Sequence, residues 1–94
     1  MNVDTKLLLG KKLLEEGKSC SEESIFKGKI SLSMCAEKCD GSASVFAFAL
    51  NAENTKRCNS SGCNCYCITG ASSDGTCNYY VNEFYNVYAY RRGN

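Results

Sequence analysis

The 94-residue sequence contains no histidine and no proline. Without histidine, a zinc finger with an imidazole ligand, a Ser-His or Cys-His catalytic pair and an imidazole pH switch are all excluded. Without proline, no segment is kept out of a sheet interior by a missing backbone N–H group. The composition therefore removes several classes of catalytic and metal site, and it leaves a sheet-rich fold open.

The chain also lacks a charge excess and a long apolar run. Eleven basic and ten acidic side chains give a net charge of +1, so no overall field favours a nucleic-acid partner. The longest apolar run, residues 45–50, is too short to cross a bilayer. The leucine-rich start KLLLGKKLLEEG carries lysines where a signal peptide needs an unbroken apolar stretch. We therefore expect a mature soluble chain without a membrane span, with Met1 interpreted as an expression start.

Eight cysteines are the most unusual feature of the composition. A core of this size barely balances the chain entropy unless covalent links add stability. An even cysteine count in a short chain favours disulfides and an oxidising compartment. The alternative is a reduced cluster in which the eight thiolates hold two zinc ions, but the C-x2-C spacing typical of such sites is missing. We expect one domain over residues 1–94, four disulfides, no cofactor, and a secreted or extracellular location.

One short helix is predicted in LSMCAEKCD. Ser31 suits the N-cap position, and Gly41 stands where a left-handed C-terminal cap favours glycine. The apolar positions of this segment recur at helical spacing and form one sulfur-bearing stripe: Leu32, Cys35, Ala36 and Cys39.

Strands are predicted on both sides of the loop that follows the helix. SVFAFAL has two apolar faces and is expected to be a central strand, with its small face (Val45, Ala47 and Ala49) turned toward the helix. CNCYCIT is a second strand, Asp74-Gly75 signals a hairpin, and EFYNVYAYRR is a closing strand. Residues 2–18 fit an extended segment with breaks at glycines. The fold class is α+β, with one short helix on an antiparallel sheet of about five strands.

Three cysteines alternate in GCNCYCITG, and their spacing matches that of the helix. Positions four apart on a helix are separated by about 6 Å, and positions two apart on a strand by about 6.6 Å. Two helix cysteines can therefore bridge two strand cysteines in parallel. Of the roughly one hundred possible connectivities we favour the set Cys35–Cys65, Cys39–Cys67, Cys58–Cys63 and Cys20–Cys77.

The order of these elements resembles the PAN/apple domain family. The resemblance rests on the segments SLSMCAEKC, SVFAFAL, CNCYC and EFYNVYAY. It covers about Leu13 to Arg91. The resemblance implies a helix cradled on a curved antiparallel sheet, and a non-enzymatic domain that binds proteins or glycans. It also implies that the second helix cysteine pairs near the start of the central strand. This sequence has Ser42, Ala43 and Ser44 there, so Cys39 must pair elsewhere.

The leading functional hypothesis is an extracellular recognition or adhesion module. Tyrosines, which combine an apolar face with a polar tip, are concentrated in the C-terminal third. Packing within the sheet is the alternative for most of them. Tyr79 and Tyr80, beside a predicted turn, are the best candidates for ligand contacts. A secreted single-domain effector, such as a toxin, an inhibitor or a defence protein, is the alternative function, and the sequence does not indicate an oligomeric state.

Catalysis is not expected. Without histidine a hydrolase would need a carboxylate pair or an activated cysteine, and no such arrangement is recognisable. The ten acidic residues lie mostly in polar loops or on solvated faces: Asp4, Glu15, Glu16, Glu22, Glu23, Glu37, Asp40, Glu53, Asp74 and Glu83.

Two further surface features give narrower predictions. Basic residues could bind a heparin-like polyanion if the N-terminal strands lie beside the closing strand, although scattered solvated lysines are the alternative. The residues concerned are Lys11, Lys12, Lys27, Lys29, Arg91 and Arg92. Asn59-Ser60-Ser61 is an N-glycosylation sequon in a predicted loop.

Overall fold

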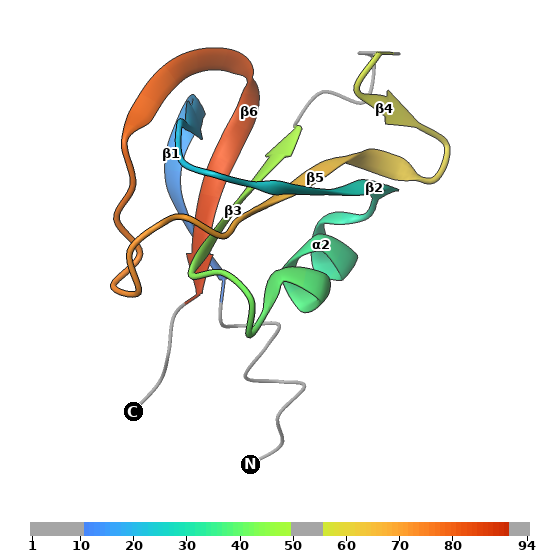
Figure 1. The fold of residues 1–94 in the computed structure, drawn as a ribbon. Coiled ribbons are helices and arrows are strands. Elements are labelled where there is room, and N and C mark those ends of the chain that lie inside the picture. The colour runs from blue at the N-terminus through green and yellow to red at the C-terminus, as the bar shows by residue number, and fades with distance from the viewer. Residues whose placement is uncertain (1–10, 50–55, 91–94) are drawn as a thin grey trace.

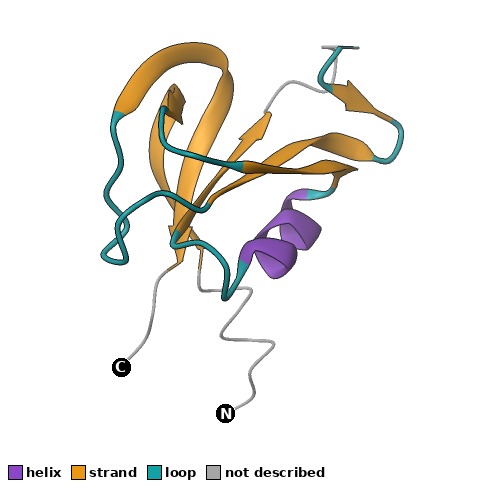
Figure 2. Cartoon of the chain, in the orientation of Figure 1, coloured by secondary structure: helices purple, strands orange, loops and turns teal. Residues whose placement is uncertain are grey.

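The computed structural model of the chain describes residues 11–49 and 56–90, where a single helix packs on an antiparallel sheet. The elements in chain order are β1 (Lys11–Cys20), β2 (Ile25–Ile30), α2 (Leu32–Cys39), β3 (Val45–Ala49), β4 (Cys58–Asn59), β5 (Gly62–Ile68) and β6 (Tyr79–Tyr90). The sheet order is β1-β6-β3-β5-β2, and β4 pairs with β5 off this path. Figures 1 and 2 show the helix against one face of the sheet. The expected small α+β domain is confirmed at this level.

The helix begins and ends where the sequence predicts. The Ser31 hydroxyl accepts a hydrogen bond from the Met34 N–H group at 3.1 Å, as an N-cap does. Gly41 has a φ of 89°, but it does not form a helical left-handed cap. Asp40 is extended, and the Ser42 N–H group donates to the Cys39 carbonyl, so Gly41 takes the third position of a type II turn. The chain therefore leaves the helix through this turn and enters β3.

The central position of β3 is confirmed, but the predicted orientation of its faces is wrong. Phe46 packs on the helix side with the helix cysteines, while Val45, Ala47 and Ala49 lie in the core on the opposite face. Phe46 lies opposite Cys67 of β5 and Tyr88 of β6 in the register. The large aromatic side chain therefore shares a face with the bridges that hold the helix.

The opposite face of β3 is covered by the curled end of the β1–β6 ribbon. The register of this ribbon shifts between Leu13 and Glu15 and again between Glu16 and Lys18, and such shifts increase twist. Leu14 and Phe84 pack against the core formed by Ala47, Ala49 and their neighbours. Small side chains at the centre of the sheet thus allow the ribbon, instead of the helix, to approach closely (Figure 1).

The predicted Asp74-Gly75 hairpin is also wrong. Gly75 does form a tight turn, in which its N–H group donates to the Ser72 carbonyl and its φ is 90°. The flanking strands β5 and β6 are nevertheless not partners. β5 pairs antiparallel with one edge of β3, and β6 pairs antiparallel with the other edge. β5 and β6 therefore run parallel to one another, and residues 69–78 form a crossing connection.

The eight cysteines form four disulfides: Cys20–Cys77, Cys35–Cys65, Cys39–Cys67 and Cys58–Cys63. These pairs coincide with the set favoured from the sequence, in which the spacing of the cysteines predicts the two helix bridges. The two helix bridges join α carbons 5.6 and 5.2 Å apart, ordinary values for unstrained bridges. No helix in the described part of the chain is long and apolar enough to span a membrane.

Candidate functional site

Tyr79 and Tyr80 start β6, and both are exposed, at 38% and 47%. They pair with Cys20 and Ser19 of β1, and successive residues of a strand point to opposite faces. Tyr80 lines a surface hollow on the side of the sheet away from the helix, and Tyr79 is not among the residues of its wall. The structure therefore separates two side chains that the sequence treats as one pair.

The hollow lies between β5 and the curled ends of β1 and β6, and its volume is about 330 Å³. Its wall consists mainly of groups that can form hydrogen bonds, together with a little apolar surface. The lining residues are Ser19, Cys20, Ser24, Arg57, Tyr66, Ile68, Tyr80, Asn82 and Tyr85. This volume is at the lower end of the range of ligand pockets.

A row of aromatic rings crosses the sheet beside the hollow, with Phe26 on β2, Tyr66 on β5 and Tyr85 on β6. The Phe26 and Tyr66 ring centres are 5.0 Å apart, and those of Tyr66 and Tyr85 are 5.9 Å apart. Both distances are in the range of favourable ring pairs. Phe26 is half exposed and Tyr85 is buried, so the row runs from solvent into the core.

Beneath Tyr85 lies a buried amide that is only partly satisfied. The Asn64 Nδ2 group donates to the Tyr85 hydroxyl at 3.1 Å, while Asn64 Oδ1 is buried and accepts no hydrogen bond from the described residues. Turning the amide over would leave Nδ2 in the same position without a partner. Buried polar atoms without partners are uncommon, and this one lies next to the floor of the hollow.

The charges near the Tyr66 hydroxyl and near the Tyr79 hydroxyl differ in sign. Burial, followed by the neighbouring Tyr85, raises the pKa of the Tyr66 hydroxyl above 10.0, and the positive charge of Arg57 acts in the opposite direction. Burial and then the negative charge of Glu15 raise the pKa of Tyr79. Tyr66 inside the hollow therefore experiences a cation, whereas Tyr79 outside it experiences an anion.

Arg57 is positioned by an aromatic side chain. Its guanidinium carbon lies 3.9 Å from the centre of the Phe84 ring, a distance suited to a cation–π contact. Arg57 is half-buried and precedes β4. This contact holds the guanidinium group at the edge of the hollow.

The predicted basic patch is divided by the sheet order. Lys12 lies on β1 beside β6, but Lys27 and Lys29 lie on β2 at the other edge of the sheet. The backbone of Lys11 pairs with Tyr90. The Lys11 side chain, Arg91 and Arg92 lie outside the described parts of the chain. The condition that the N-terminal strands border the closing strand is thus met by β1 and not by β2.

Asn59 is exposed at the end of β4, directly before the tight turn to β5. Its Oδ1 atom accepts hydrogen bonds from the N–H groups of Ser61 and Gly62 at 2.7 and 3.2 Å. The Cys58–Cys63 bridge encloses this turn. Glycosylation at Asn59 stays a prediction, since the structure shows only that the side chain is at the surface.

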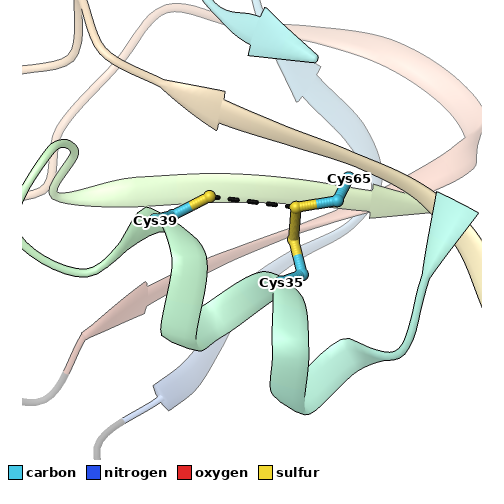
Figure 3. Close-up of side chains that lie close together, drawn as sticks. All are labelled: Cys35, Cys39 and Cys65. Carbon is cyan, nitrogen blue, oxygen red and sulfur yellow. Dashed lines mark hydrogen bonds between the residues drawn. A yellow bond between two sulfur atoms is a disulfide. The ribbon is translucent and has the colours of Figure 1, made fainter. Parts of the chain in front are cut away.

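A cluster of sulfur atoms joins the helix to the sheet (Figure 3). Cys35, Cys39 and Cys65 bring their sulfur atoms within 4.8 Å of one another, and those of Cys39 and Cys65 are 3.8 Å apart. Metal ligation needs thiolates, yet all eight cysteines are bonded in pairs. The 3.8 Å approach is a van der Waals contact, because neither sulfur of a disulfide carries a proton. The cluster therefore fastens the helix.

A second hollow, of about 530 Å³, lies where the helix exit, residues 69–75 and the end of β6 meet. Its wall is built largely from small residues of turns. The one carboxylate there, Asp74, accepts hydrogen bonds from the Thr76 N–H group and hydroxyl at 3.1 and 2.8 Å, and these bonds lower its pKa. Among its described lining residues the larger hollow has a single aromatic side chain, Tyr90, whereas the smaller one has three tyrosines, so we take the tyrosine-lined hollow as the candidate site.

Sequence reasoning identifies Tyr80 but misses most of the site. Tyr66 could have been found, because it alternates with cysteines that face the helix and must therefore point to the other side. Arg57, Asn82 and Ser24 come from separate loops and strands, and only the strand order brings them together. The sequence matches no protein-family model, and neither a curated protein nor a solved structure matches it significantly.

Proposed function

We propose that this domain is a non-catalytic recognition module that binds a protein or glycan ligand outside the cell. The observation that carries the proposal is the tyrosine-lined hollow next to the exposed Tyr80 ring. Tyrosine supplies contact area at low entropic cost and keeps a hydroxyl for hydrogen bonding. Hydroxyl and amide groups from three strands and one loop, together with the Arg57 guanidinium group from a second loop, converge on this space, as polar groups do in binding sites.

Two features support the proposed extracellular location and the proposed membership of the PAN/apple family. Four disulfides in so short a chain are typical of secreted domains. A helix with two cysteines, bridged to the strand next to a central aromatic strand, agrees with the order of elements in that family. The family assignment belongs to the proposal.

The absence of catalysis also belongs to the proposal. The hollow is lined by phenols, hydroxyls, an amide and a guanidinium group. Among the lining residues that the structure describes, none supplies a carboxylate, an imidazole or a free thiol able to act as a general base or nucleophile near neutral pH. The lining suits binding better than bond cleavage.

The test compares two adjacent tyrosines. The disulfide-bonded domain is applied to an array of glycans and extracellular matrix proteins, together with the variants Tyr80→Ala and Tyr79→Ala. We expect bound ligands to be lost or strongly weakened with Tyr80→Ala and retained with Tyr79→Ala. Equal binding by both variants, or no bound ligand at all, would contradict the proposed site.

A further inference from the structure

The only N-glycosylation sequon of the sequence, Asn59-Ser60-Ser61, lies where β4 turns into β5. All three side chains are exposed, and this turn lies at the outer rim of the molecule (Figure 1). The sugar is attached to the asparagine amide nitrogen, and the sequon is defined by the hydroxyl residue two positions on. Both side chains are therefore at the surface of the folded domain.

Hydrogen bonds fix the orientation of the Asn59 amide. The N–H groups of Ser61 and Gly62 donate to one end of this amide at 2.7 and 3.2 Å. Two donors require an acceptor, so the atom that faces the turn is Oδ1 and not Nδ2. Nδ2 is bonded to the same carbon and is directed away from these two N–H groups. A sugar on Nδ2 leaves Oδ1 a carbonyl oxygen, so both hydrogen bonds of the turn are kept.

The Cys58–Cys63 bridge closes the segment that contains the sequon. The two cysteines pair directly across β4 and β5, and their α carbons are 3.9 Å apart. If the segment were free to stretch, these α carbons could separate by about 17 Å, whereas a disulfide keeps them within about 7 Å. A glycosyltransferase has to enclose the acceptor segment and draw the amide into its own site. The bridge removes the freedom that this step requires.

We propose that Asn59 is an N-glycosylation site that is open only until the Cys58–Cys63 bridge forms. In the first step the bond between C1 of the first sugar and the diphosphate of a lipid-linked donor breaks. C1 bonds to Asn59 Nδ2, which releases one proton, and the lipid diphosphate leaves. In the second step the two thiols lose two protons and two electrons to a disulfide oxidant, which becomes a dithiol. The reverse order leaves Asn59 unmodified.

The rates of the two steps allow the glycan to be attached first. A chain is synthesised at about 5–20 residues per second, while disulfide formation takes from seconds to hours. A transferase that acts on the emerging chain therefore meets the sequon before its bridge has formed. The inference shares the secreted location with the proposed recognition function and does not involve the tyrosine-lined hollow.

The first experiment measures glycan transfer to the purified full chain. The acceptor is supplied to oligosaccharyltransferase and its lipid-linked donor in two forms, one reduced with its thiols blocked by methylation and one with four disulfides. We expect the reduced chain to gain one glycan at Asn59 and the oxidised chain to react more slowly by about tenfold or more. Equal rates would overturn the closing of the site by oxidation, and an unmodified reduced chain would overturn the site itself.

The second experiment separates the bridge from the rest of the fold. The double substitution Cys58→Ser and Cys63→Ser opens the turn and keeps three bridges, whereas the matched control, Cys20→Ser and Cys77→Ser, opens a different bridge. We expect the first oxidised variant to accept the glycan faster than oxidised wild type, and the control to react as slowly as wild type. Equal rates for the two variants would overturn the role of the Cys58–Cys63 bridge.

Two neighbouring serines of the same turn test the acceptor site. Ser61→Ala removes the sequon hydroxyl and keeps the N–H group that donates to Asn59, while Ser60→Ala leaves the sequon intact. Both are assayed as reduced, methylated chains, so folding does not affect the comparison. We expect no transfer to Ser61→Ala and transfer at the wild-type rate to Ser60→Ala. Equal transfer to both would overturn the assignment of the sequon.

The last experiment examines the wild-type chain secreted by a eukaryotic host. We expect one non-reduced peptide, identified by mass spectrometry, to contain both the glycan on Asn59 and the Cys58–Cys63 bridge. A bridge found only in chains without the glycan would show that the sugar prevents the turn from closing, and secretion without any glycan would contradict the proposed order of steps. Binding of the unglycosylated Ser61→Ala domain to the ligand array tests the recognition function separately, so either proposal can fail without the other.

Discussion

At the scale of single residues, Gly62 marks the place where β5 lies between β2 on one edge and β4 on the other. β2 ends with Ile30 paired to Cys63, and β4 pairs Asn59 with Gly62 just beyond. A Cβ atom at Gly62 would lie 2.1 Å from the carbonyl carbon and oxygen of Ile30, and the φ of Gly62 is 148°. Only glycine allows the backbones to come this close, so β5 can pass the end of β2 on one edge while it pairs with β4 on the other edge.

Replacing Gly62 by alanine should therefore destabilise the domain strongly. The added methyl group meets backbone atoms, which cannot rotate away, and the positive φ adds strain. We expect a loss of about 3 kcal/mol or more in the free energy of unfolding, similar to other severe steric and backbone effects. This loss is measured by denaturant unfolding of the oxidised protein, with circular dichroism as the probe.

Gly41→Ala provides the matched control. Gly41 also has a positive φ, 89°, but no atom lies within 4 Å of a Cβ built there. Only the backbone strain remains, and it costs about 1–2 kcal/mol. A loss for Gly62→Ala no larger than that for Gly41→Ala would show that the strand junction relaxes, contrary to the close approach of its backbones.

At the scale of elements, the short helix is held by links outside itself. An eight-residue helix is too short to be stable in isolation. Two disulfides join it to β5, and the Tyr90 hydroxyl donates a hydrogen bond to the Ala36 carbonyl. Its buried residues are Cys35, Ala36 and Cys39. The helix is therefore stabilised chiefly by its sulfur-bearing face.

Removal of a helix bridge should cost more than removal of the bridge inside the β4–β5 turn. The double substitution Cys39→Ala and Cys67→Ala opens a link between residues 28 apart, whereas Cys58 and Cys63 are 5 apart. The chain-entropy model gives about 1.5 kcal/mol more stabilisation for the longer loop, within a total of about 2–4 kcal/mol per bridge. Cys39 and Cys67 are also fully buried, so alanine there leaves a cavity.

Denaturant unfolding of the two double variants, both with three remaining bridges, provides the comparison. We expect the helix-bridge variant to unfold at lower denaturant and to lose helical signal before the sheet unfolds. An equal or larger loss for the variant that replaces Cys58 and Cys63 would mean that the turn, not the helix clamp, limits stability.

These elements also show how far the sequence predicts the fold. The distance spanned by four helix residues matches that spanned by two strand residues. This match depends only on local geometry, so the sequence predicts the two helix bridges. β2 is missed because Ile25 and Phe26 are adjacent and Lys27 and Lys29 flank a glycine, which hides the two-residue alternation. The hairpin at Gly75 is wrong because a turn signal gives a chain reversal without stating which strands become partners. The hollow depends on the same strand order, so most of its residues cannot be predicted from the sequence.

At the scale of the whole molecule, the sheet carries different chemistry on its two faces and its two edges. One face holds the helix and two disulfides, and the other holds the curled ribbon and the tyrosine-lined hollow. β1 and β2 form the outer strands, with β6, β3 and β5 between them. Surface charges on the two edges are therefore separated by the width of the sheet.

This separation predicts weak binding of heparin by the lysines of β2. Four strand spacings of about 4.8 Å place β1 and β2 roughly 19 Å apart along the sheet, more than the screening length of about 8 Å at physiological salt. Lys27 and Lys29 therefore act without the support of Lys12. Replacing both by glutamine should lower the salt concentration that elutes the domain from a heparin column no more than replacing Lys18 and Lys38 by glutamine does.

The comparison holds net charge constant, because each double variant removes two positive charges. Lys18 already pairs with Glu15 at 3.5 Å, and Lys38 lies in the last turn of the helix, so neither belongs to the β2 edge. A distinctly larger fall in elution salt for the β2 variant would show that Lys27 and Lys29 form a polyanion site of their own. Equal falls would mean that heparin responds only to net charge, which leaves the tyrosine-lined hollow as the surface where specific recognition is expected.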